Sequence, residues 1–453
     1  MYNLIIYLYY LGVVIVSLFS EKVRKMWRGE RDATRILREK VDPTAKYVWF
    51  HAASLGEFEQ GRPLMEQLRR EHPEYKILLT FFSPSGYEVR KNYEGADIIC
   101  YLPLDTITNA RRFLRTVRPV MAFFIKYEFW YNYLHILKHR GVPVYSVSSI
   151  FRPNQVFFRW YGHQYSHVLK CFTRFYVQND ISRDLLATLG ITDVTVVGDT
   201  RFDRVLQIKE AAKQLPVVEN FIGHGDNVNV DVNVNALAAP HSQRENNVDV
   251  HVNVPVNKVF VAGSSWQPDE DIFIPFFKEH KDWKLIIAPH VIGEDHLQQI
   301  ESKLDAIGFT HARYTQVNVD VDVDVNVDVP VSVPVPVNAL IIDCFGLLSS
   351  IYRYADVTYV GGGFGVGIHN TLEAAVWDVP VIFGPNNQRF QEAQGLKACG
   401  GGLEITNADD FRRIMQRLID EPQAIADAGR KAGAFVQQMT GATKKILADI
   451  QLP

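Results

Sequence analysis

The sequence is poor in cysteine and has no excess of charge of either sign. Its four cysteines lie far from one another and form no CxxC pair, which fits a reducing compartment and gives no zinc site. The net charge of −3 leaves no basic excess to neutralise phosphates, so a general nucleic-acid binder is not expected. P-loop, HExxH and GxSxG motifs are also missing, and the histidines show no metal spacing. We therefore expect no bound metal, no cofactor and no nucleic-acid partner.

The rest of the composition is that of an ordinary globular protein. Of 453 residues, 47% are hydrophobic and 22% are charged. This length is enough for two domains, each with its own core. We expect an N-terminal domain over 21–207 and a C-terminal domain over 208–453.

The first nineteen residues carry no charge and are largely apolar. They are about long enough to cross a bilayer or to lie deep in one leaflet, and they lack the basic start and cleavage site of a secretory signal. A basic cluster from Lys22 to Arg31 follows directly, and positive charge on this side of an anchor holds the rest of the chain in the cytoplasm. We expect a membrane anchor over 1–20; the alternative is a buried core helix.

Short apolar runs alternate with helix-like stretches along the rest of the chain. This rhythm, with short links, predicts an α/β protein with parallel, doubly wound sheets in two Rossmann-like domains that face a cleft. The expected strands are 47–50, 75–82, 97–102, 120–125, 142–147 and 194–197 in the first half, and 258–263, 285–288, 339–343, 357–360 and 379–383 in the second.

Two segments, 227–257 and 317–338, interrupt this rhythm. In both, valine alternates with asparagine, aspartate or proline with little other variety. Strict alternation is formally a half-buried strand, but such repetition with several prolines is typical of low-complexity insertions. We expect them to loop out beside the second domain, and we assign no chemistry to them.

One stretch of the first half combines signals for a strand, a turn and a helix. The apolar run 47–50 leads into a small-residue turn that contains Ser54, and Glu57 stands at the start of the helical segment 58–71. These are the parts of a ligand site at the carboxyl edge of an α/β sheet. Glu57 is therefore either a general base or a charge that stabilises the helix start.

A second carboxylate, Glu128, lies just past the expected strand 120–125. It should face the same cleft as Glu57, because both follow strands at the same sheet edge. Lys126 and Trp130 alternate with it, so the three side chains share one face if this segment is extended. Either Glu128 belongs to an acceptor site, or it is a structural carboxylate paired with Lys126 or an arginine.

The second half contains five glycines between Gly361 and Gly367, followed by Asn370 and Glu373. Glycines after a strand expose backbone N–H groups, and a helix start near 369–370 would bind a phosphate through its free amides and dipole. Glu373, one turn further on, could accept hydrogen bonds from ribose hydroxyls. The spacing is not the GxGxxG dinucleotide fingerprint, and the simpler alternative is a turn with Asn370 as a helix cap.

Two more polar residues follow expected strands of the second half. Ser264 comes after strand 258–263, and His290 comes after strand 285–288. Either could donate a hydrogen bond to a phosphate or a sugar, although a single histidine after a strand is more often structural.

Taken together, these motifs resemble those of the Kdo (3-deoxy-D-manno-oct-2-ulosonic acid) transferases of lipopolysaccharide synthesis, which have the GT-B glycosyltransferase fold. The resemblance covers almost the whole chain apart from the two insertions. Its most specific part is the HAASLGE block that ends at Glu57. The motifs that follow in the family's order are Glu128-Phe-Trp130 with Asn132, Gly263-Ser264, Ala288-Pro289, Gly361 to Gly363, His369-Asn370 with Glu373, and Phe383-Gly-Pro385.

The resemblance implies a role for each candidate residue. Glu57 would be the catalytic base; Ser54, Lys126 and Glu128 would bind the acceptor, a lipid A precursor (lipid IVA). Asn370 and Glu373 would contact the nucleotide of the donor CMP-Kdo. The other residues expected on the donor side are Ser264, His290, Gly346 and Gly363. The protein would act at the inner membrane, with its catalytic domains on the cytoplasmic face.

The chain departs from the family pattern at two places. An arginine that the family usually has between the proline and the histidine is missing, so Pro289 is followed directly by His290. The residues of the turn from Asp343 to Gly346 also differ from those usual in the family. Donor-phosphate contacts in these two regions are thus less well defined than the role of Glu57.

Two other functions fit the same motifs. Another GT-B enzyme, such as a lipid-linked N-acetylglucosaminyl transferase or a nucleotide-sugar epimerase, would prefer a UDP-sugar. A non-catalytic sugar-nucleotide binding module would keep the site at 361–373 and would not need Glu57.

Overall fold

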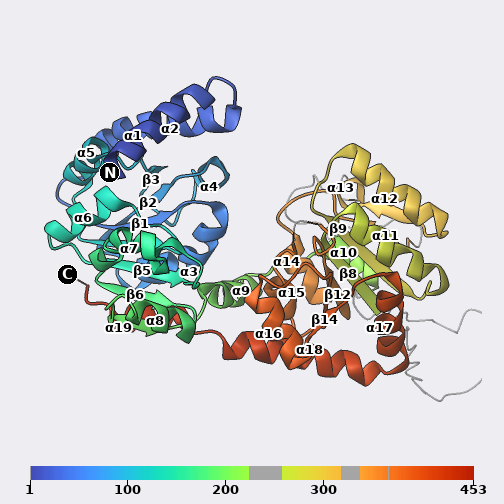
Figure 1. The fold of residues 1–453 in the computed structure, drawn as a ribbon. Helices are drawn as coiled ribbons and strands as arrows, with labels where there is room; N and C mark the ends of the chain where they lie inside the picture. Colours follow the sequence, from blue (N-terminus) through green and yellow to red (C-terminus); the bar gives the residue numbers. More distant parts are fainter. Residues whose placement is uncertain (1, 224–257, 318–336, 366, 453) are drawn as a thin grey trace, which may run out of the picture. The chain divides into compact units, whose positions relative to one another are not determined.

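A computed structural model describes residues 2–223, 258–317, 337–365 and 367–452. The chain forms two compact units, which we call unit 1 (Met1–Gln207 with Gln438–Pro453) and unit 2 (Ile208–Gln437) (Figure 1). The division after Gln207 coincides with the expected domain boundary. The expected low-complexity insertions, 227–257 and 317–338, lie outside the described residues except at 317, 337 and 338.

Unit 1 is built on a parallel sheet with the strand order β3-β2-β1-β4-β5-β6-β7. Strand β1, in the interior of the sheet, is buried on both faces and mostly apolar, as a parallel strand covered by helices on each side requires. The strands are β1 (Lys46–Ala52), β2 (Tyr75–Phe81), β3 (Ile98–Tyr101), β4 (Met121–Ile125), β5 (Val144–Ser149), β6 (Arg174–Val177) and β7 (Val194–Val196).

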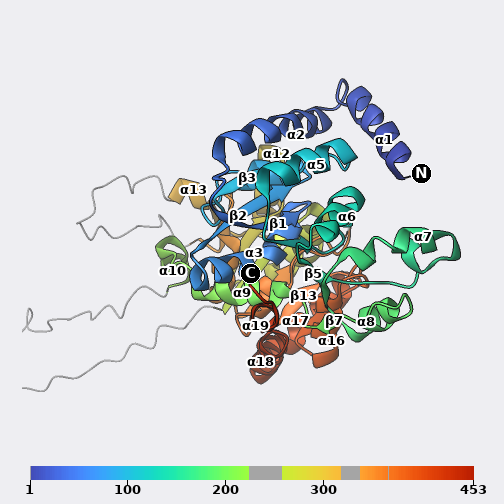
Figure 2. The same cartoon turned by 90° about the vertical axis from the view of Figure 1, so that its left-hand side faces the viewer.

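Helices cover both faces of this sheet (Figures 1 and 2). Alternate residues of β1 point to opposite faces: Trp49 packs in the core beneath α2, α5 and α6, whereas Phe50 packs in the core with α3. The α-helices are α1 (Tyr2–Val16), α2 (Glu21–Lys40), α3 (Leu55–Glu71), α4 (Pro84–Arg90), α5 (Ile107–Val117), α6 (Tyr131–His139), α7 (His163–Ser166), α8 (Asp180–Ala187), α9 (Thr200–Glu210) and α19 (Ala442–Asp449), and 3₁₀ turns lie at Val156–Phe158, Trp160–Gly162 and Leu169–Cys171.

The last helix, α19, belongs to unit 1, although the sequence placed it in the C-terminal domain. Ala442 and Ile446 are fully buried in the core that contains Phe50 and helix α3. Asp203 accepts hydrogen bonds from the backbone N–H groups of Gly441 and Thr443 at 2.6 and 2.7 Å. An apolar stripe at helical spacing predicts burial, but it does not say against which sheet the helix packs.

The expected anchor is a helix that is docked on unit 1. Helix α1 has 15 residues, and in the described part of the chain no helix has both the length and the apolar character needed to cross a membrane. The Tyr2 hydroxyl donates to Asp105 at 2.6 Å, and the Asn132 side chain donates to Asn3 at 2.8 Å. The first residues are therefore part of unit 1 rather than a separate span.

Unit 2 repeats the architecture with the strand order β10-β11-β9-β8-β12-β13-β14, again all parallel. Its core contains Phe260, Trp283 and Tyr359, all almost fully buried. The strands are β8 (Lys258–Ser265), β9 (Trp283–Pro289), β10 (His311–Arg313), β11 (Ala339–Ile341), β12 (Val357–Val360), β13 (Val381–Phe383) and β14 (Gly402–Glu404).

The helices of unit 2 connect and cover these strands (Figure 1). They are α10 (Pro216–Ile222), α11 (Gln267–Phe273), α12 (Glu294–Ala306), α13 (Tyr314–Val317), α14 (Leu348–Ile351), α15 (Leu372–Ala375), α16 (Gln391–Cys399), α17 (Ala408–Asp420) and α18 (Pro422–Gln438), with 3₁₀ turns at Ile274–Glu279 and Tyr352–Tyr354. The expected pair of Rossmann-like units is confirmed.

Candidate functional site

The two carboxylates singled out in unit 1 follow neighbouring strands. Strands β1 and β4 pair directly, and Glu57 and Glu128 lie in the segments that follow their carboxyl ends. The two carboxylates lie close enough that the negative charge of Glu128 raises the pKa of Glu57. The structure therefore brings these two predicted residues together at one sheet edge.

Glu57 is held by the residue that begins its own helix. The backbone N–H and the hydroxyl of Ser54 both donate to Glu57 Oε2, at 2.9 and 3.1 Å. This is a capping box, in which the third helical residue reaches back to the cap. No group of the described residues donates to Glu57 Oε1, so one oxygen is fixed while the other can accept a proton.

The surroundings of Glu57 raise its pKa above the ordinary glutamate value. Burial is the main cause, and the negative charge of Glu128 adds to it. The hydrogen bonds from Ser54 and the positive potential of His51 and Lys126 act in the opposite direction. A carboxylate with a raised pKa is a better proton acceptor near neutral pH than an exposed one.

Glu128 is oriented by two side chains that were not among the predicted site residues. Its Oε2 lies 3.1 Å from His51 Nε2 and accepts a hydrogen bond from Trp130 Nε1 at 2.6 Å. The His51 ring is fully buried, and its Nδ1 lies 2.9 Å from the Thr80 hydroxyl. Because a carboxylate can only accept, Nε2 of His51 donates to Glu128, while Nδ1 lies next to both the hydroxyl and the carbonyl oxygen of Thr80, the latter at 3.2 Å.

Lys126 does not lie on an extended strand with Glu128 and Trp130, as the sequence had suggested. Strand β4 ends at Ile125, and Lys126 has a φ of 66°, in the left-handed region. Its N–H still donates to Val147 of the next strand at 2.8 Å. The chain therefore turns at Lys126, and the extended conformation that would place residues 126, 128 and 130 on one face is not present.

In unit 2 the glycines allow two loops at the carboxyl edge to approach through their backbones. A Cβ atom on Gly361 would lie 2.3 Å from the Ser264 carbonyl oxygen, and one on Gly363 would lie 2.5 Å from the Cα of Gly384. Ser264 itself has a φ of 53° at the end of β8. Among the described residues nothing hydrogen-bonds to its hydroxyl, which leaves it available at this edge.

Most backbone amides of the glycine-rich loop are used within the protein, contrary to the expectation that they are exposed. Gly361 N–H donates to Gly263, Gly362 N–H to the Asp269 carboxylate, and His369 N–H to the Gly361 carbonyl. In the described part of the loop, the amides without an acceptor are those of Gly363, Phe364, Asn370 and Thr371. A phosphate could therefore bind only to this smaller set.

The helix after this loop begins later than expected and is short. Helix α15 runs over Leu372–Ala375, only four residues, so the expected start at 369–370 is wrong and little dipole is available. Asn370 caps the turn, because its Oδ1 accepts from Leu372 N–H at 3.2 Å, and its Nδ2 donates to Glu373 Oε1 at 2.9 Å. Asn370 and Glu373 are thus neighbours, as predicted.

His290 belongs to a stack of three rings. The Trp266 and His290 rings lie 4.8 Å apart, and the His290 and His369 rings lie 4.3 Å apart. Trp266 Nε1 donates to His369 Nε2 at 3.1 Å. Burial and the adjacent His290 lower the pKa of His369 to about 4, so His369 is neutral at physiological pH and accepts this hydrogen bond.

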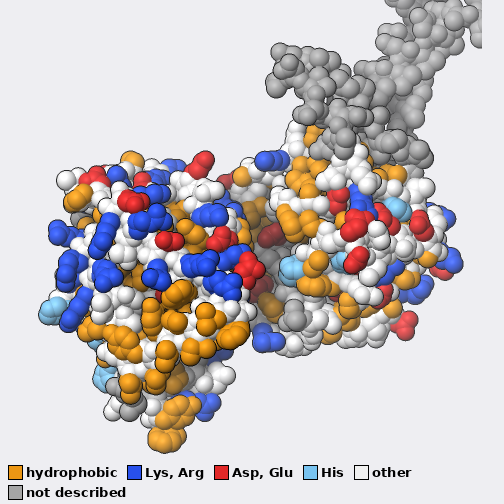
Figure 3. All heavy atoms as spheres, turned by 90° about the horizontal axis from the view of Figure 1, so that it is seen from above, with side chains coloured by type: hydrophobic (Ala, Val, Ile, Leu, Met, Phe, Trp, Pro, Cys, Tyr) orange, Lys and Arg blue, Asp and Glu red, His pale blue; other side chains and the backbone are white. Residues whose placement is uncertain are grey.

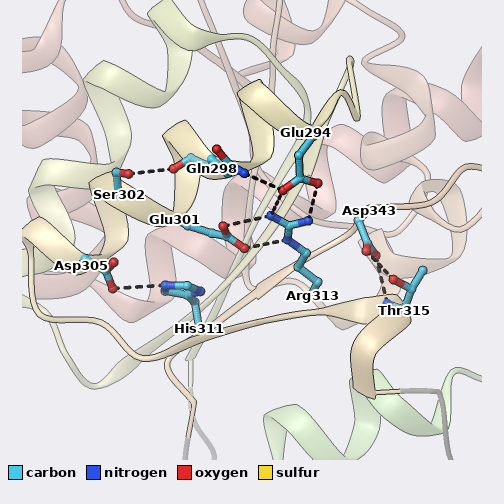
Figure 4. A network of polar contacts seen from close by, with 9 residues as sticks. All are labelled: Glu294, Gln298, Glu301, Ser302, Asp305, His311, Arg313, Thr315 and Asp343. Atoms are coloured by element: carbon cyan, nitrogen blue, oxygen red, sulfur yellow. Dashed lines mark hydrogen bonds and ion pairs between the residues drawn. The ribbon is translucent and has the colours of Figure 1, made fainter.

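An ion-pair network fixes the segment that follows His290 (Figure 4). Arg313 of β10 binds Glu294 at 2.8 and 2.9 Å and Glu301 at 2.6 and 3.0 Å, both on α12. Hydrogen bonds from Arg313 lower the pKa of Glu294 to about 2. The start of α12 is therefore tied to the sheet while Glu294 is ionised, which limits the positions that the loop carrying His290 can take.

Gly346 is the predicted site residue for which the structure gives least support. It lies in the exposed turn after β11 with a φ of 91°, and a Cβ placed there would meet nothing within 4 Å. Nearby, Asp343 accepts from the N–H of Thr315 at 2.9 Å (Figure 4). The glycine is explained by its backbone conformation, and a contact of Gly346 with a donor remains a prediction.

Metal ligation has no obvious place in the described part of the chain. Over these residues, no three His, Cys, Asp or Glu side chains cluster in a way that could hold an ion. The groups that can take part in binding or catalysis at the two sheet edges are therefore the polar side chains and backbone amides described above.

The comparison with protein families identifies this chain's relatives. Residues 28–204, nearly all of unit 1, match the family model "3-Deoxy-D-manno-octulosonic-acid transferase (kdotransferase)". A 3-deoxy-D-manno-octulosonic acid transferase from Bordetella pertussis is 27% identical over 418 residues, which cover 89% of this chain and 87% of that protein. The chain is a relative of the Kdo transferases.

Another relative is a longer protein. A bifunctional glycosyltransferase/methyltransferase from Fusobacterium nucleatum is 23% identical over 387 residues, and these cover 83% of this chain but only 53% of that protein. This chain thus spans about half the length of that relative.

Solved structures support the fold. A UDP-GlcNAc 2-epimerase from Neisseria meningitidis aligns with a TM-score of 0.56 and 14% identity over 89% of this chain and 98% of that one. At this identity the likeness concerns the fold alone. Together with the two parallel sheets, it confirms the expected two-domain GT-B fold.

Proposed function

We propose that this chain is an inverting glycosyltransferase that moves Kdo from CMP-Kdo to a hydroxyl group of a lipid A precursor, in lipopolysaccharide synthesis. Its relationship to the Kdo transferases supports the reaction class. The observation that carries the assignment of the base is the asymmetry of Glu57. Ser54 fixes Oε2 with two hydrogen bonds, while no described group donates to Oε1.

In this reaction Glu57 takes the proton of the acceptor hydroxyl. The acceptor oxygen forms a bond to the anomeric carbon of Kdo as the bond from that carbon to the phosphate oxygen breaks. CMP leaves with the electron pair, and attack from the opposite face inverts the anomeric centre. The charge of Glu128, held in place by His51 and Trp130, increases the basicity of Glu57.

The donor half of the reaction is assigned to unit 2. The N–H groups of Gly363, Phe364, Asn370 and Thr371 are the donors we propose for the phosphate of CMP, because the other described amides of this loop already have acceptors. Asn370 and Glu373 would hold the nucleoside, and Ser264 and His290 would contact the phosphate or the sugar. Such preorganised donors stabilise a leaving phosphate without reorganisation during the reaction.

The direct test is to incubate the purified protein with CMP-Kdo and lipid A precursor and to determine the masses of the lipid products. We expect an acceptor that has gained one or more Kdo residues, and none with the Glu57→Gln variant on the same time scale. Turnover of a UDP-sugar with no use of CMP-Kdo would contradict the proposal and favour another GT-B activity.

The raised pKa of Glu57 leads to a prediction about pH. The base must be deprotonated, so kcat/KM should fall with decreasing pH through an acid limb that lies above the ordinary glutamate pKa. In Glu128→Gln the neighbouring negative charge is removed, and the acid limb should move to lower pH. Glutamine can still accept from Trp130 and His51, so the local geometry is kept. An acid limb that stays in place or moves upward would contradict this electrostatic coupling.

We also propose that unit 1 attaches to the cytoplasmic face of the inner membrane through helix α1, which lies in one leaflet. Leu4, Leu8 and Leu11 are 66%, 62% and 57% exposed on this helix. The Tyr2 ring stacks on Tyr165 of α7, next to an exposed aromatic pair, Trp160 and Tyr161; in Figure 2, α1 and α7 lie on the same side. Helices of this kind bind membranes by burying apolar side chains at the interface.

Replacing Leu4, Leu8 and Leu11 together by serine should weaken binding to anionic phospholipid vesicles by about tenfold or more, because three leucines would no longer enter the bilayer. Their exposure predicts little change in thermal stability. The control replaces Val89 and Ile181 by serine. These residues are 56% and 62% exposed on other helices of unit 1, so the control should leave vesicle binding nearly unchanged. Equal losses in both variants, measured by vesicle flotation, would count against α1 as the attachment site.

A further inference from the structure

Unit 1 contains a pocket of about 730 Å³ between helices α1, α2 and α5. None of the site residues discussed above lines it. Its wall includes Tyr10 of α1, Trp27 of α2 and Pro103 of the segment that precedes α5. The pocket lies beside β3, the edge strand of the sheet, two strands away from β1.

Arginines dominate the charge of this pocket. Arg31, Arg35 and Arg38 recur on one face of α2, and Arg112 faces them from α5. In the described part of the chain only Arg35 has an acidic partner, Asp32 at 3.4 Å, and both are largely exposed. Arg31 lies over the Trp27 ring, with its guanidinium carbon 4.8 Å from the ring centroid.

The acidic residues of the pocket do not cancel this charge. Glu39 also lines the pocket without an ion pair in the described part of the chain. Glu30 accepts one hydrogen bond, from Leu104 N–H at 3.1 Å, and burial raises its pKa to about 7. Near neutral pH Glu30 therefore carries only part of a negative charge, and the four arginines leave a net positive site.

Two of the lining residues carry buried polar atoms that have no hydrogen-bond partner within the described chain. These atoms are Trp27 Nε1 and Glu30 Oε1. A buried polar atom without a partner is costly, so a ligand or water that reaches them would be stabilised. Guanidinium groups in such numbers match the oxygens of a phosphate in charge and geometry.

The apolar side of the pocket narrows the class of ligand. Tyr10 belongs to α1, whose exposed leucines form an apolar surface, and the basic residues of α2 and α5 lie next to it (Figure 3). A molecule that places a phosphate among the arginines would thus have its other end beside this apolar helix. A free phosphate would use only half of these contacts.

We propose that this pocket binds the phosphate-bearing headgroup of a membrane amphiphile. The inference goes beyond glycosyl transfer and does not depend on it. Arginines from two helices hold the phosphate, and the acyl chains lie along α1.

The test uses the full chain and dihexanoyl phosphatidate, a soluble amphiphile with a phosphate monoester, in a calorimetric titration. Arg38→Ala with Arg112→Ala removes one pocket arginine from each helix, and binding should weaken by about tenfold or more. The control, Arg28→Ala with Arg111→Ala, removes the same charge from exposed positions on the same two helices outside the pocket. Its affinity should stay within about twofold of the parent, since distant surface charges are screened.

A second titration distinguishes the two possible sources of the phosphate. Inorganic phosphate should bind at least about tenfold more weakly than dihexanoyl phosphatidate, because it cannot bury acyl chains beside α1. Equal affinities would overturn the assignment to an amphiphile. Equal losses in the pocket variant and its control, or no loss in either, would overturn the pocket itself. Because these titrations do not measure transfer, failure of this inference and failure of the Kdo-transferase assignment can be told apart.

Discussion

Glu57→Gln is expected to lower the turnover number by about a hundred- to ten-thousand-fold, the contribution that a positioned general base typically makes. Donor affinity and thermal stability should stay close to those of the parent. The reason is geometric: a glutamine at this position can still accept the two hydrogen bonds from Ser54, and glutamine fits a capping box as well as glutamate does. What it cannot do is take the proton of the acceptor hydroxyl. Steady-state kinetics and thermal unfolding of one purified variant check both statements.

Ser54→Ala is the control that separates capping from catalysis. It removes the hydroxyl that donates to Glu57 Oε2 but keeps the backbone N–H. It should therefore cost about 1 kcal/mol of stability, as the loss of a helix cap does, with a much smaller change in turnover. If Glu57→Gln instead loses stability and keeps its turnover, Glu57 is only a helix-start residue and Glu128 becomes the next candidate for the base.

The sequence predicted most strands of both sheets, because buried parallel strands are continuous apolar runs. It missed β6 (Arg174–Val177), β10 (His311–Arg313) and β14 (Gly402–Glu404). These three strands have only three or four residues, and such short segments leave too little pattern to distinguish a strand from a turn. Their places follow from the pairing of neighbouring strands, which a single sequence does not show.

The two explanations of Glu57 show why a sequence alone does not decide a residue's role. A helix-start charge and a general base are alternatives in the sequence, but the structure allows both: Oε2 makes the capping contact, and Oε1 of the same carboxylate is available. The capping signal, a serine followed three residues later by glutamate, is local and readable. Whether the second oxygen is free depends on tertiary neighbours. In the same way, the contact between His51 and Glu128 joins residues 77 positions apart and leaves no local signal.

The glycine-rich loop was misread because its anchor lies elsewhere in the chain. The motif from Gly361 to Gly367 looked like a row of exposed amides, but Gly362 N–H is bound by Asp269, a residue 93 positions away that no motif singled out. A buried carboxylate on α11 thus decides which amides remain for a ligand. Asp269 is also the residue for which we expect the largest loss of stability.

Asp269→Ala should destabilise unit 2 by roughly 3 kcal/mol or more, because it leaves two buried donors and one part-buried donor without an acceptor, and a buried donor costs about 1–3 kcal/mol before relaxation. The carboxylate is 1% exposed. Its Oδ1 accepts from the Tyr359 hydroxyl at 2.8 Å, and its Oδ2 accepts from the N–H groups of Gly362 and Trp266, both at 2.9 Å. Urea unfolding of the full chain measures the loss of stability, and hydrogen exchange of the native protein shows whether the loss lies in unit 2.

The control for this prediction is Asp271→Ala, two residues away on the same helix. Asp271 is 54% exposed and, among the described residues, pairs only with Lys303, at 2.7 Å, so its loss should cost less than about 1 kcal/mol. Because Asp269 holds the loop next to the amides proposed for the donor phosphate, folded Asp269→Ala protein should also exchange the amides of 361–369 faster and bind CMP-Kdo more weakly. Exchange and stability equal to those of Asp271→Ala would mean that the loop is held by its glycine packing against Ser264 and Gly384 rather than by Asp269.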